Sequence, residues 1–283
     1  EIVFGDWSSD VGSSDLAEAD DFTHNDPDSL TLQKHVQRVV LFPPRTDATA
    51  NDDLKYALTT YGAVATSIYM STMPGYWNEA TDAYYYTGTA AANHGVTLVG
   101  WDDAYSRTNF PTPPPGDGAF IVRNSWGPTW GDAGYFYVSY YDTELGYETN
   151  AVFTQAQPTD NYGRVYQHDP LGYVSSLGFS GEETAWFANQ FTAVADEELA
   201  AVGFYAPAPD ATYEVYAGAT LSTKQLEASG TVSEFGYQTV RLDSPLGLTQ
   251  GQPFVVAVKL TVPLFEGSWV APLVVEIPLR DHS

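Results

Sequence analysis

Residues 93–101 read NHGVTLVGW and residues 118–127 read GAFIVRNSWG. Both runs are short, rich in β-branched and aromatic residues, and bounded by glycine or a turn residue, which predicts two strands. His94 stands at the start of the first predicted strand and Asn124 at the end of the second. If these strands are neighbours, the Asn124 amide oxygen can accept a hydrogen bond from His94 Nδ1, leaving Nε2 to face a nucleophile. Trp126 would then cover this bond from water.

The surrounding sequence predicts one helix and further strands. Residues 51–61 have apolar residues at helical spacing, with Asn51 as the N-cap and Gly62 as the C-terminal cap. Residues 111–118 (PTPPPGDG) predict a loop, and residues 1–50 are interpreted as irregular and acidic. The predicted strands that follow the helix are 63–69, 95–101, 119–123 and 135–140. One helix followed by four strands predicts a partly closed, barrel-like antiparallel sheet.

The second half of the chain has a different pattern. Apolar periodicity lapses at residues 154–161, so we predict one domain over residues 1–157 and another over residues 158–283. The latter has short strand-like segments separated by Gly, Pro and Asp turns, and no helical pattern competes with them. They include 185–191, 199–205, 213–217, 237–242, 254–262 and 273–277. The chain is therefore expected to be mainly β, with an antiparallel β-sandwich at its C-terminal end.

Composition limits the partners. The chain of 283 residues has 36 acidic and 11 basic residues, a formal charge of −25. A nucleic acid or an anionic membrane surface needs a Lys/Arg stripe, and the sequence has none. Two interpretations stay open: a surface adapted to high salt, which the scarcity of lysine favours, or an acidic extracellular protein. No run of about 18 apolar residues occurs, so no membrane-spanning helix is predicted.

Cysteine is absent from all 283 residues. The chain therefore has neither disulfides nor a thiolate of its own. It opens on Glu1 rather than Met, and we expect it to begin part-way through a longer product.

The two runs at residues 93–101 and 118–142 resemble the C-terminal half of the papain family of cysteine peptidases, and the resemblance spans residues 20–153. It implies that His94 pairs with the thiolate and later protonates the leaving amine, while Asn124 orients the imidazole. Trp126 is implied to shield their hydrogen bond, with Trp130 packed behind it. Two further residues, Ser67 and Gly95, are implied to lie near the pocket for the substrate's second residue before the cleavage point.

The departures from the family are equally informative. Nothing in residues 1–50 resembles the helix that carries the family's nucleophilic cysteine and oxyanion glutamine. We therefore predict a cysteine-type peptidase, acting on peptides or proteins, that is inactive as this chain alone. An N-terminal segment or separate chain would supply the cysteine and would pack on an exposed apolar face. The alternatives are a surface binding or adhesion protein on a decayed peptidase scaffold, and a pseudo-peptidase that holds substrates without cutting them.

The C-terminal half resembles the lectin-like β-domain that follows papain-type domains in archaeal and bacterial surface proteins, on residues 166–172, 185–193 and 199–205. This implies an extracellular or cell-surface protein with a cell-surface glycan as a possible partner. Trp186 and Trp269 are expected in the core. The adjacent His168 and Asp169 give no ligand geometry and are expected to be structural, so no metal or cofactor is predicted.

Overall fold

The computed structural model describes residues 33–71, 73, 75–168, 175–177, 182–263 and 273–275. These residues form two compact units. The N-terminal unit comprises residues 41–154, and the C-terminal unit comprises the described residues of 33–40 and 155–275. Each unit is described by itself below. Within the described chain, no helix has the length and apolar character needed to span a membrane.

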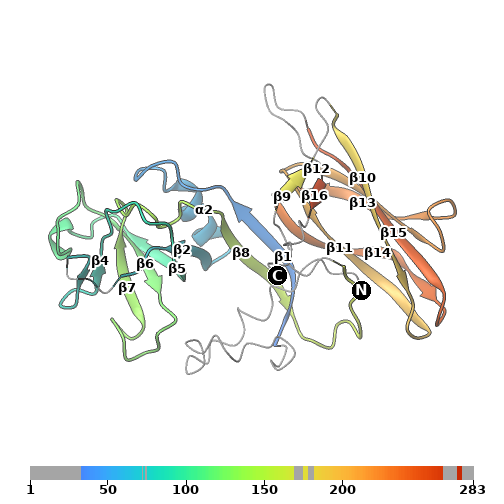
Figure 1. The fold of residues 1–283 in the computed structure, drawn as a ribbon, viewed down its shortest axis with the longest axis horizontal. Helices are drawn as coiled ribbons and strands as arrows, with labels where there is room; N and C mark the ends of the chain where they lie inside the picture. Colours follow the sequence, from blue (N-terminus) through green and yellow to red (C-terminus); the bar gives the residue numbers. More distant parts are fainter. Residues whose placement is uncertain are drawn as a thin grey trace, which may run out of the picture. The chain divides into compact units, whose positions relative to one another are not determined.

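The N-terminal unit is built on one mixed sheet (Figure 1). Its strands are β2 (Val64–Ile68), β3 (Trp77–Asn78), β4 (Ala83–Tyr84), β5 (His94–Asp102), β6 (Ala119–Arg123), β7 (Tyr135–Ser139) and the start of β8 (Asn150–Gln157). Their order is β8-β2-β5-β6-β7-β4-β3. All pairs within it are antiparallel except β4 with β7, which are parallel. The four predicted strands are confirmed, and the parallel β4–β7 pair was not foreseen.

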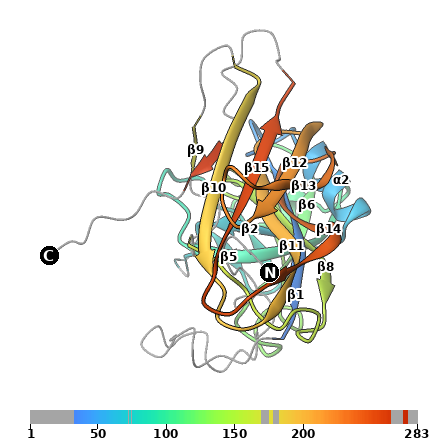
Figure 2. The same ribbon diagram turned by 90° about the vertical axis from the view of Figure 1, so that its right-hand side faces the viewer.

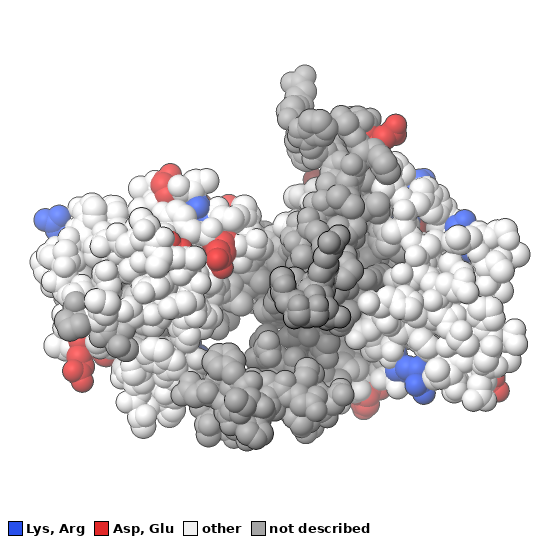
Figure 3. Space-filling model, in the orientation of Figure 1, with Lys and Arg blue, Asp and Glu red and all other residues white. Residues whose placement is uncertain are grey.

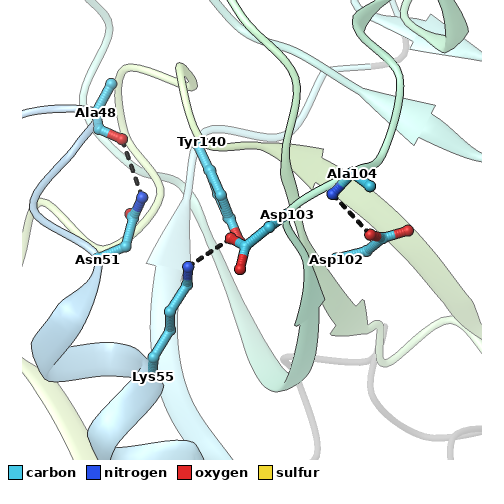
Figure 4. Close-up of polar contacts among 7 residues, drawn as sticks. All are labelled: Ala48, Asn51, Lys55, Asp102, Asp103, Ala104 and Tyr140. Carbon is cyan, nitrogen blue, oxygen red and sulfur yellow. Dashed lines mark hydrogen bonds and ion pairs between the residues drawn. The ribbon is translucent and has the colours of Figure 1, made fainter.

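The α-helix that the structure describes in this unit, α2 (Asp52–Thr60), buries Leu54, Ala57 and Leu58. Gly62 follows the helix with φ +103°, a conformation that glycine adopts without strain, and its N–H donates to the Leu58 carbonyl at 3.2 Å. The prediction of Gly62 as the terminating residue is therefore confirmed. Asn51 precedes the helix, but its side chain does not cap it. Its Nδ2 donates instead to the Ala48 carbonyl at 3.0 Å, so the predicted side-chain cap is wrong (Figure 4).

A surface ion pair ties α2 to the sheet. Lys55 Nζ lies 2.5 Å from Asp103 Oδ1, which also accepts the Tyr140 hydroxyl at 2.8 Å (Figure 4). The same ammonium lies 5.6 Å from the ring centroid of Trp101 and 5.0 Å from that of Tyr140. Lys55 therefore contacts both a carboxylate and two aromatic rings. These contacts hold the first turns of α2 next to the ends of β5 and β7.

The C-terminal unit is a sandwich of antiparallel strands. One sheet has the order β10-β15-β12-β13, of which β10, β15 and β12 are seen side by side in Figure 2. In the other, β14 lies between β11 and β1, and β9 pairs with β16 separately. The strands are β1 (His35–Phe42), β9 (Ser175–Leu177), β10 (Thr184–Thr192), β11 (Glu197–Ala206), β12 (Ala211–Gly218), β13 (Gln225–Val232), β14 (Gly236–Leu248), β15 (Pro253–Thr261) and β16 (Leu273–Val275).

Both sheets contribute to one apolar core in this unit. Phe204 and Leu199 come from β11, while Val215 comes from β12 and Leu260 from β15, and all four are fully buried. This confirms the predicted β-sandwich. Three strands of this unit lie outside the predicted segments: β1, which lies in the region expected to be irregular, β9, and β13 (QLEASGTV), whose polar and small residues lack a strong strand signal.

The tryptophan prediction for this unit is wrong at Trp186. That side chain is 48% exposed on strand β10, whereas its neighbour Ala185 is 6% exposed. The alternation of a strand places these two residues on opposite faces. Trp269 lies outside the described residues, as does Asp169. His168 stacks on Phe191 with ring centroids 4.5 Å apart, which fits the structural role expected of it.

Charged side chains are scattered on the described part of the face shown in Figure 3. Several red groups and a blue one lie close together at the upper left of this view, and most of the described surface is uncharged. No continuous basic stripe appears on that part of the face, which agrees with the excess of 36 acidic over 11 basic residues in the sequence.

Candidate active site

His94 is fixed at the first position of β5 by the residue before it. The Asn93 side chain accepts the Met70 N–H at 2.8 Å and donates to the Met70 carbonyl at 3.2 Å. The Asn93 backbone N–H also donates to the Ile68 carbonyl at 3.1 Å. His94 itself lies opposite Ile68 in the β2–β5 ladder. The hydrogen bonds of Asn93 and the pairing of His94 with Ile68 thus fix the start of β5, which carries the histidine.

Asn124 follows the last residue of β6 and is only 3% exposed. Its backbone N–H donates to the Gly134 carbonyl at 2.9 Å, closing the loop between β6 and β7. This loop turns at Gly127 and Gly134, whose φ values of +85° and +92° favour glycine. Gly127 and Gly134 therefore shape the turn that follows Asn124.

The structure brings His94 and Asn124 into direct contact, with His94 Nε2 2.8 Å from Asn124 Oδ1. The same Oδ1 accepts the Ser125 backbone N–H at 2.8 Å. Because a backbone N–H only donates, the amide atom that it meets must be the oxygen, and the histidine nitrogen opposite must carry a proton. The neutral ring is therefore the Nε2–H tautomer. The amide's Nδ2 is buried and has no hydrogen-bond partner among the described residues.

This geometry corrects one sequence-based expectation. The orienting hydrogen bond was predicted at Nδ1, with Nε2 free for the nucleophile, and the structure reverses the two nitrogens. Nδ1 is the nitrogen left to act as a base. The reason is the direction of approach: Asn124 meets the far side of the ring from the histidine backbone, where Nε2 lies.

An aromatic group covers the His94–Asn124 pair. The Trp126 ring lies 5.2 Å from the His94 ring, tilted by 36°, and meets Trp130 edge-on at 5.0 Å. Trp130 in turn stacks on Trp77 at 4.8 Å and packs edge-on against Phe136. This arrangement places apolar surface beside the polar contact, where it lowers the local dielectric and strengthens the hydrogen bond.

Ser67 and Gly95 lie directly opposite each other in the β2–β5 ladder. Since successive side chains of a strand point to opposite faces, the Ser67 side chain lies on the face opposite that of His94. Its hydroxyl donates to Glu148 Oε2 at 2.6 Å. A Cβ at Gly95 would meet no atom within 4 Å, so this exposed glycine leaves open space beside His94. Glu148 is a neighbour of this pair that the sequence did not indicate.

Two buried charges hold the segment before β8. Arg45 is 5% exposed and donates to the carbonyls of Leu145 and Tyr140 at 3.0 and 2.7 Å. Asp142 is fully buried and accepts three backbone N–H groups, those of Tyr86, Glu144 and Leu145. Burial raises the pKa of Asp142 to about 6, although the three N–H groups and Arg45 oppose the shift.

No group of three or more His, Cys, Asp and Glu side chains suited to a metal ion occurs among the residues that the structure describes. The described part of the site thus consists of an imidazole, an amide and aromatic cover. It can take up and return a proton at Nδ1, but it has no nucleophile, because the sequence contains no cysteine.

Comparisons with known proteins agree with this geometry. Residues 17–155 match the papain family of cysteine proteases, and residues 165–283 match a lectin like domain. The chain is therefore a papain-family peptidase domain followed by a lectin-like domain.

Two solved structures combine both parts. The clostridial cysteine protease Cwp84, after propeptide cleavage, is 30% identical over 83% of this chain, with a TM-score of 0.69. The cysteine protease and lectin-like domains of Cwp84, described as a surface layer associated protein of Clostridium difficile, are 29% identical over 83% of the chain, with a TM-score of 0.66. This chain covers 57% and 51% of those two chains.

The curated relatives match short stretches of the chain. Vignain of Vigna mungo is 46% identical over 43 residues, which is 15% of this chain and 9% of the relative. Cathepsin B-like protease 1 of Arabidopsis thaliana is 34% identical over 68 residues, 24% of this chain and 16% of the relative. The chain thus spans a small part of the curated proteins that it matches.

Proposed function

We propose that the N-terminal unit is the histidine–asparagine half of a cysteine peptidase site, completed by a cysteine that another segment or chain supplies. The observation that carries this proposal is the contact of His94 Nε2 with Asn124 Oδ1 at 2.8 Å. It fixes the ring and its tautomer and leaves Nδ1 available. In this proposal His94 is the catalytic base and acid, Asn124 orients it, and Trp126 protects their hydrogen bond.

The proposed steps follow from the free Nδ1. Nδ1 takes the proton of the incoming cysteine, and the thiolate attacks the substrate's carbonyl carbon. The resulting oxyanion collapses as the C–N bond breaks, and Nδ1–H protonates the leaving amine. Nδ1 then takes a proton from water, which attacks the thioester and releases the acid and the thiol. Asn124 keeps the ring in place through each of these proton transfers.

Because the chain has no cysteine, it would bind peptides without cleaving them when alone. We propose that the backbone at Gly95 and Ser67 lines the path of the peptide, while the Ser67 hydroxyl lies on the opposite face of the sheet and donates to Glu148 at 2.6 Å. The exposed position of Gly95 supports this, since backbone next to His94 is open to a ligand. We place the domain boundary near residue 157, between the two matched regions.

The likeness to a surface layer associated protease supports a cell-surface location, and the lectin-like domain supports a cell-surface glycan as a partner. Adaptation to high salt stays a prediction from the charge of −25. A second candidate function is surface binding on a decayed peptidase scaffold, which the absence of cysteine favours. The intact His94–Asn124 hydrogen bond favours the peptidase, because a scaffold has no need of an oriented imidazole.

Hydrolysis of a fluorogenic peptide library tests the proposal. The chain alone should show no thiol-dependent hydrolysis. The chain expressed together with the polypeptide encoded upstream of Glu1 should hydrolyse peptides, and iodoacetamide should abolish this activity. A completed protein that contains the upstream cysteine but stays inactive under reducing conditions would contradict the peptidase and favour the binding function.

A further inference from the structure

The sheet β10-β15-β12-β13 carries one aromatic and two charged side chains in a row on one face. Trp186 of β10 lies opposite Lys259 of β15, and Lys259 lies opposite Glu214 of β12. Tyr216, two residues after Glu214, shares this face because side chains alternate along a strand. Two strand spacings separate the Trp186 and Glu214 strands, about 9.5 Å. The row therefore spans a width greater than one aromatic ring.

Close contacts join these residues into one cluster. The Trp186 and Tyr216 rings lie 5.1 Å apart at an angle of 38°. Glu214 accepts hydrogen bonds from Lys259 Nζ at 2.6 Å and from the Tyr216 hydroxyl. Lys224 Nζ lies 5.3 Å from the Trp186 ring centroid and 5.4 Å from that of Tyr216. We call these five residues, Trp186, Glu214, Tyr216, Lys224 and Lys259, the Trp186 platform.

The platform leaves its largest aromatic surface open. Trp186 is 48% exposed although Tyr216 and two lysines lie against it. An exposed indole held by neighbours on a rigid strand presents apolar area with little rotamer freedom left to lose on binding. The residue therefore has the properties of a binding surface rather than of a core position.

The charge of the platform differs from that of the chain. Two of the four lysines in the sequence, Lys224 and Lys259, lie in this cluster. Glu214 balances Lys259, whereas Lys224 has no carboxylate partner among the described residues and donates to the Leu221 carbonyl at 3.1 Å. The platform thus carries one uncompensated positive charge in a chain of net charge −25.

We propose that the Trp186 platform binds an acidic saccharide, a proposal that rests on the glycan binding proposed above. The face of a pyranose ring stacks on the indole of Trp186. Glu214 and the Tyr216 hydroxyl bond the sugar's hydroxyl groups, and the ammonium of Lys224 pairs with a carboxylate substituent. A cationic ligand is disfavoured, because Lys224 and Lys259 place two positive charges beside the Trp186 ring.

Binding of the full chain to a microarray of matched neutral and uronate-bearing oligosaccharides, followed by titration calorimetry with the best ligand, tests this proposal. Trp186→Ala should weaken binding by roughly tenfold or more, as truncation of an aromatic anchor does. Lys224→Gln should weaken binding of the uronate-bearing sugar more than of its neutral counterpart. The matched control is Val194→Ala, because Val194 is 49% exposed in the same unit and lies outside the platform; its affinity should not change.

The outcomes separate the site from the function. A wild-type chain that binds no oligosaccharide would overturn both the platform and the proposed glycan binding. Binding that Trp186→Ala leaves unchanged would overturn the platform alone, with glycan binding intact elsewhere. Binding of a protein partner in place of any sugar, lost with Trp186→Ala, would also overturn the saccharide proposal. Unchanged thermal unfolding of each variant shows that it is folded.

Discussion

The His94–Asn124 pair and the Trp186 platform are built in the same way but differ in burial. Each combines side chains from antiparallel strands or strand ends with aromatic rings. Asn124 is 3% exposed and its oxygen has two donors, whereas Trp186 is 48% exposed. The His94–Asn124 pair is partly buried and has one geometry, which suits proton transfer. The platform keeps an open surface, which suits recognition.

Peptide hydrolysis should depend strongly on His94 and not on Trp186. In the protein completed with its cysteine-bearing segment, His94→Ala should lower kcat/KM for a short peptide by roughly 10⁴-fold, because the thiolate loses its base and the amine its acid. Trp186→Ala is the control and should leave this rate unchanged. Comparable loss in both variants would show that the two sites do not act separately.

The buried cation Arg45 should contribute much more to the stability of the protein than the surface cation Lys259. Arg45→Ala should lower the free energy of unfolding by about 3–5 kcal/mol, because it leaves the buried carbonyls of Leu145 and Tyr140 without their charged donors. Urea unfolding measures this difference. A loss below about 1 kcal/mol would mean that water reaches the Arg45 site.

Asp142 makes the stability of the N-terminal unit depend on pH. Its pKa is raised in the folded state to about 6 from an ordinary value of 3.8, so the folded protein binds more protons than the unfolded chain between these values. The contribution of Asp142 to the free energy of unfolding is fully present below about pH 4. It is lost as the pH rises through 6, and the loss is up to about 3 kcal/mol. Urea unfolding should show this decline in the wild type and not in Asp142→Asn. Parallel pH profiles of the two proteins would contradict the assignment.

The smallest expected effect lies on the platform itself. Lys259→Met should change the free energy of unfolding by about 0–1 kcal/mol, because the Lys259–Glu214 pair is partly exposed and its Coulomb energy is screened by water. Thermal unfolding in low and high salt measures it. A loss as large as that of Arg45→Ala would show that the platform is a structural element and not a ligand surface.

The sequence predicts the His94–Asn124 contact because its residues lie in two compact strand motifs of strong β character. It could not predict which imidazole nitrogen meets the amide, since that depends on the approach of Asn124 to the ring. The platform was missed for a different reason. Its members are spread from residue 186 to residue 259, and Trp186 is flanked by Ala185 and Phe187, so the sequence around it looks like core.

Strand pairing explains the other successes and failures. The predicted strands with β-branched and aromatic alternation are present, as is the helix over 52–60. β13 forms despite a weak intrinsic signal because β12 pairs with it along its whole length, from Ala211 with Val232 to Ala217 with Gln225. Asn51 fails as a side-chain cap because the Ala48 carbonyl takes its amide. At β13 a pairing strand overrides a weak local preference, whereas at Asn51 one local hydrogen bond takes the place of another.

Nitrogen-15 NMR of the imidazole rings measures the tautomer of His94 in the chain alone. We expect the neutral His94 ring to be protonated at Nε2 and bare at Nδ1, and Asn124→Ala to remove this preference. A His94 ring protonated at Nδ1, or one whose tautomer is indifferent to Asn124, would contradict an imidazole oriented to receive the proton of an incoming cysteine.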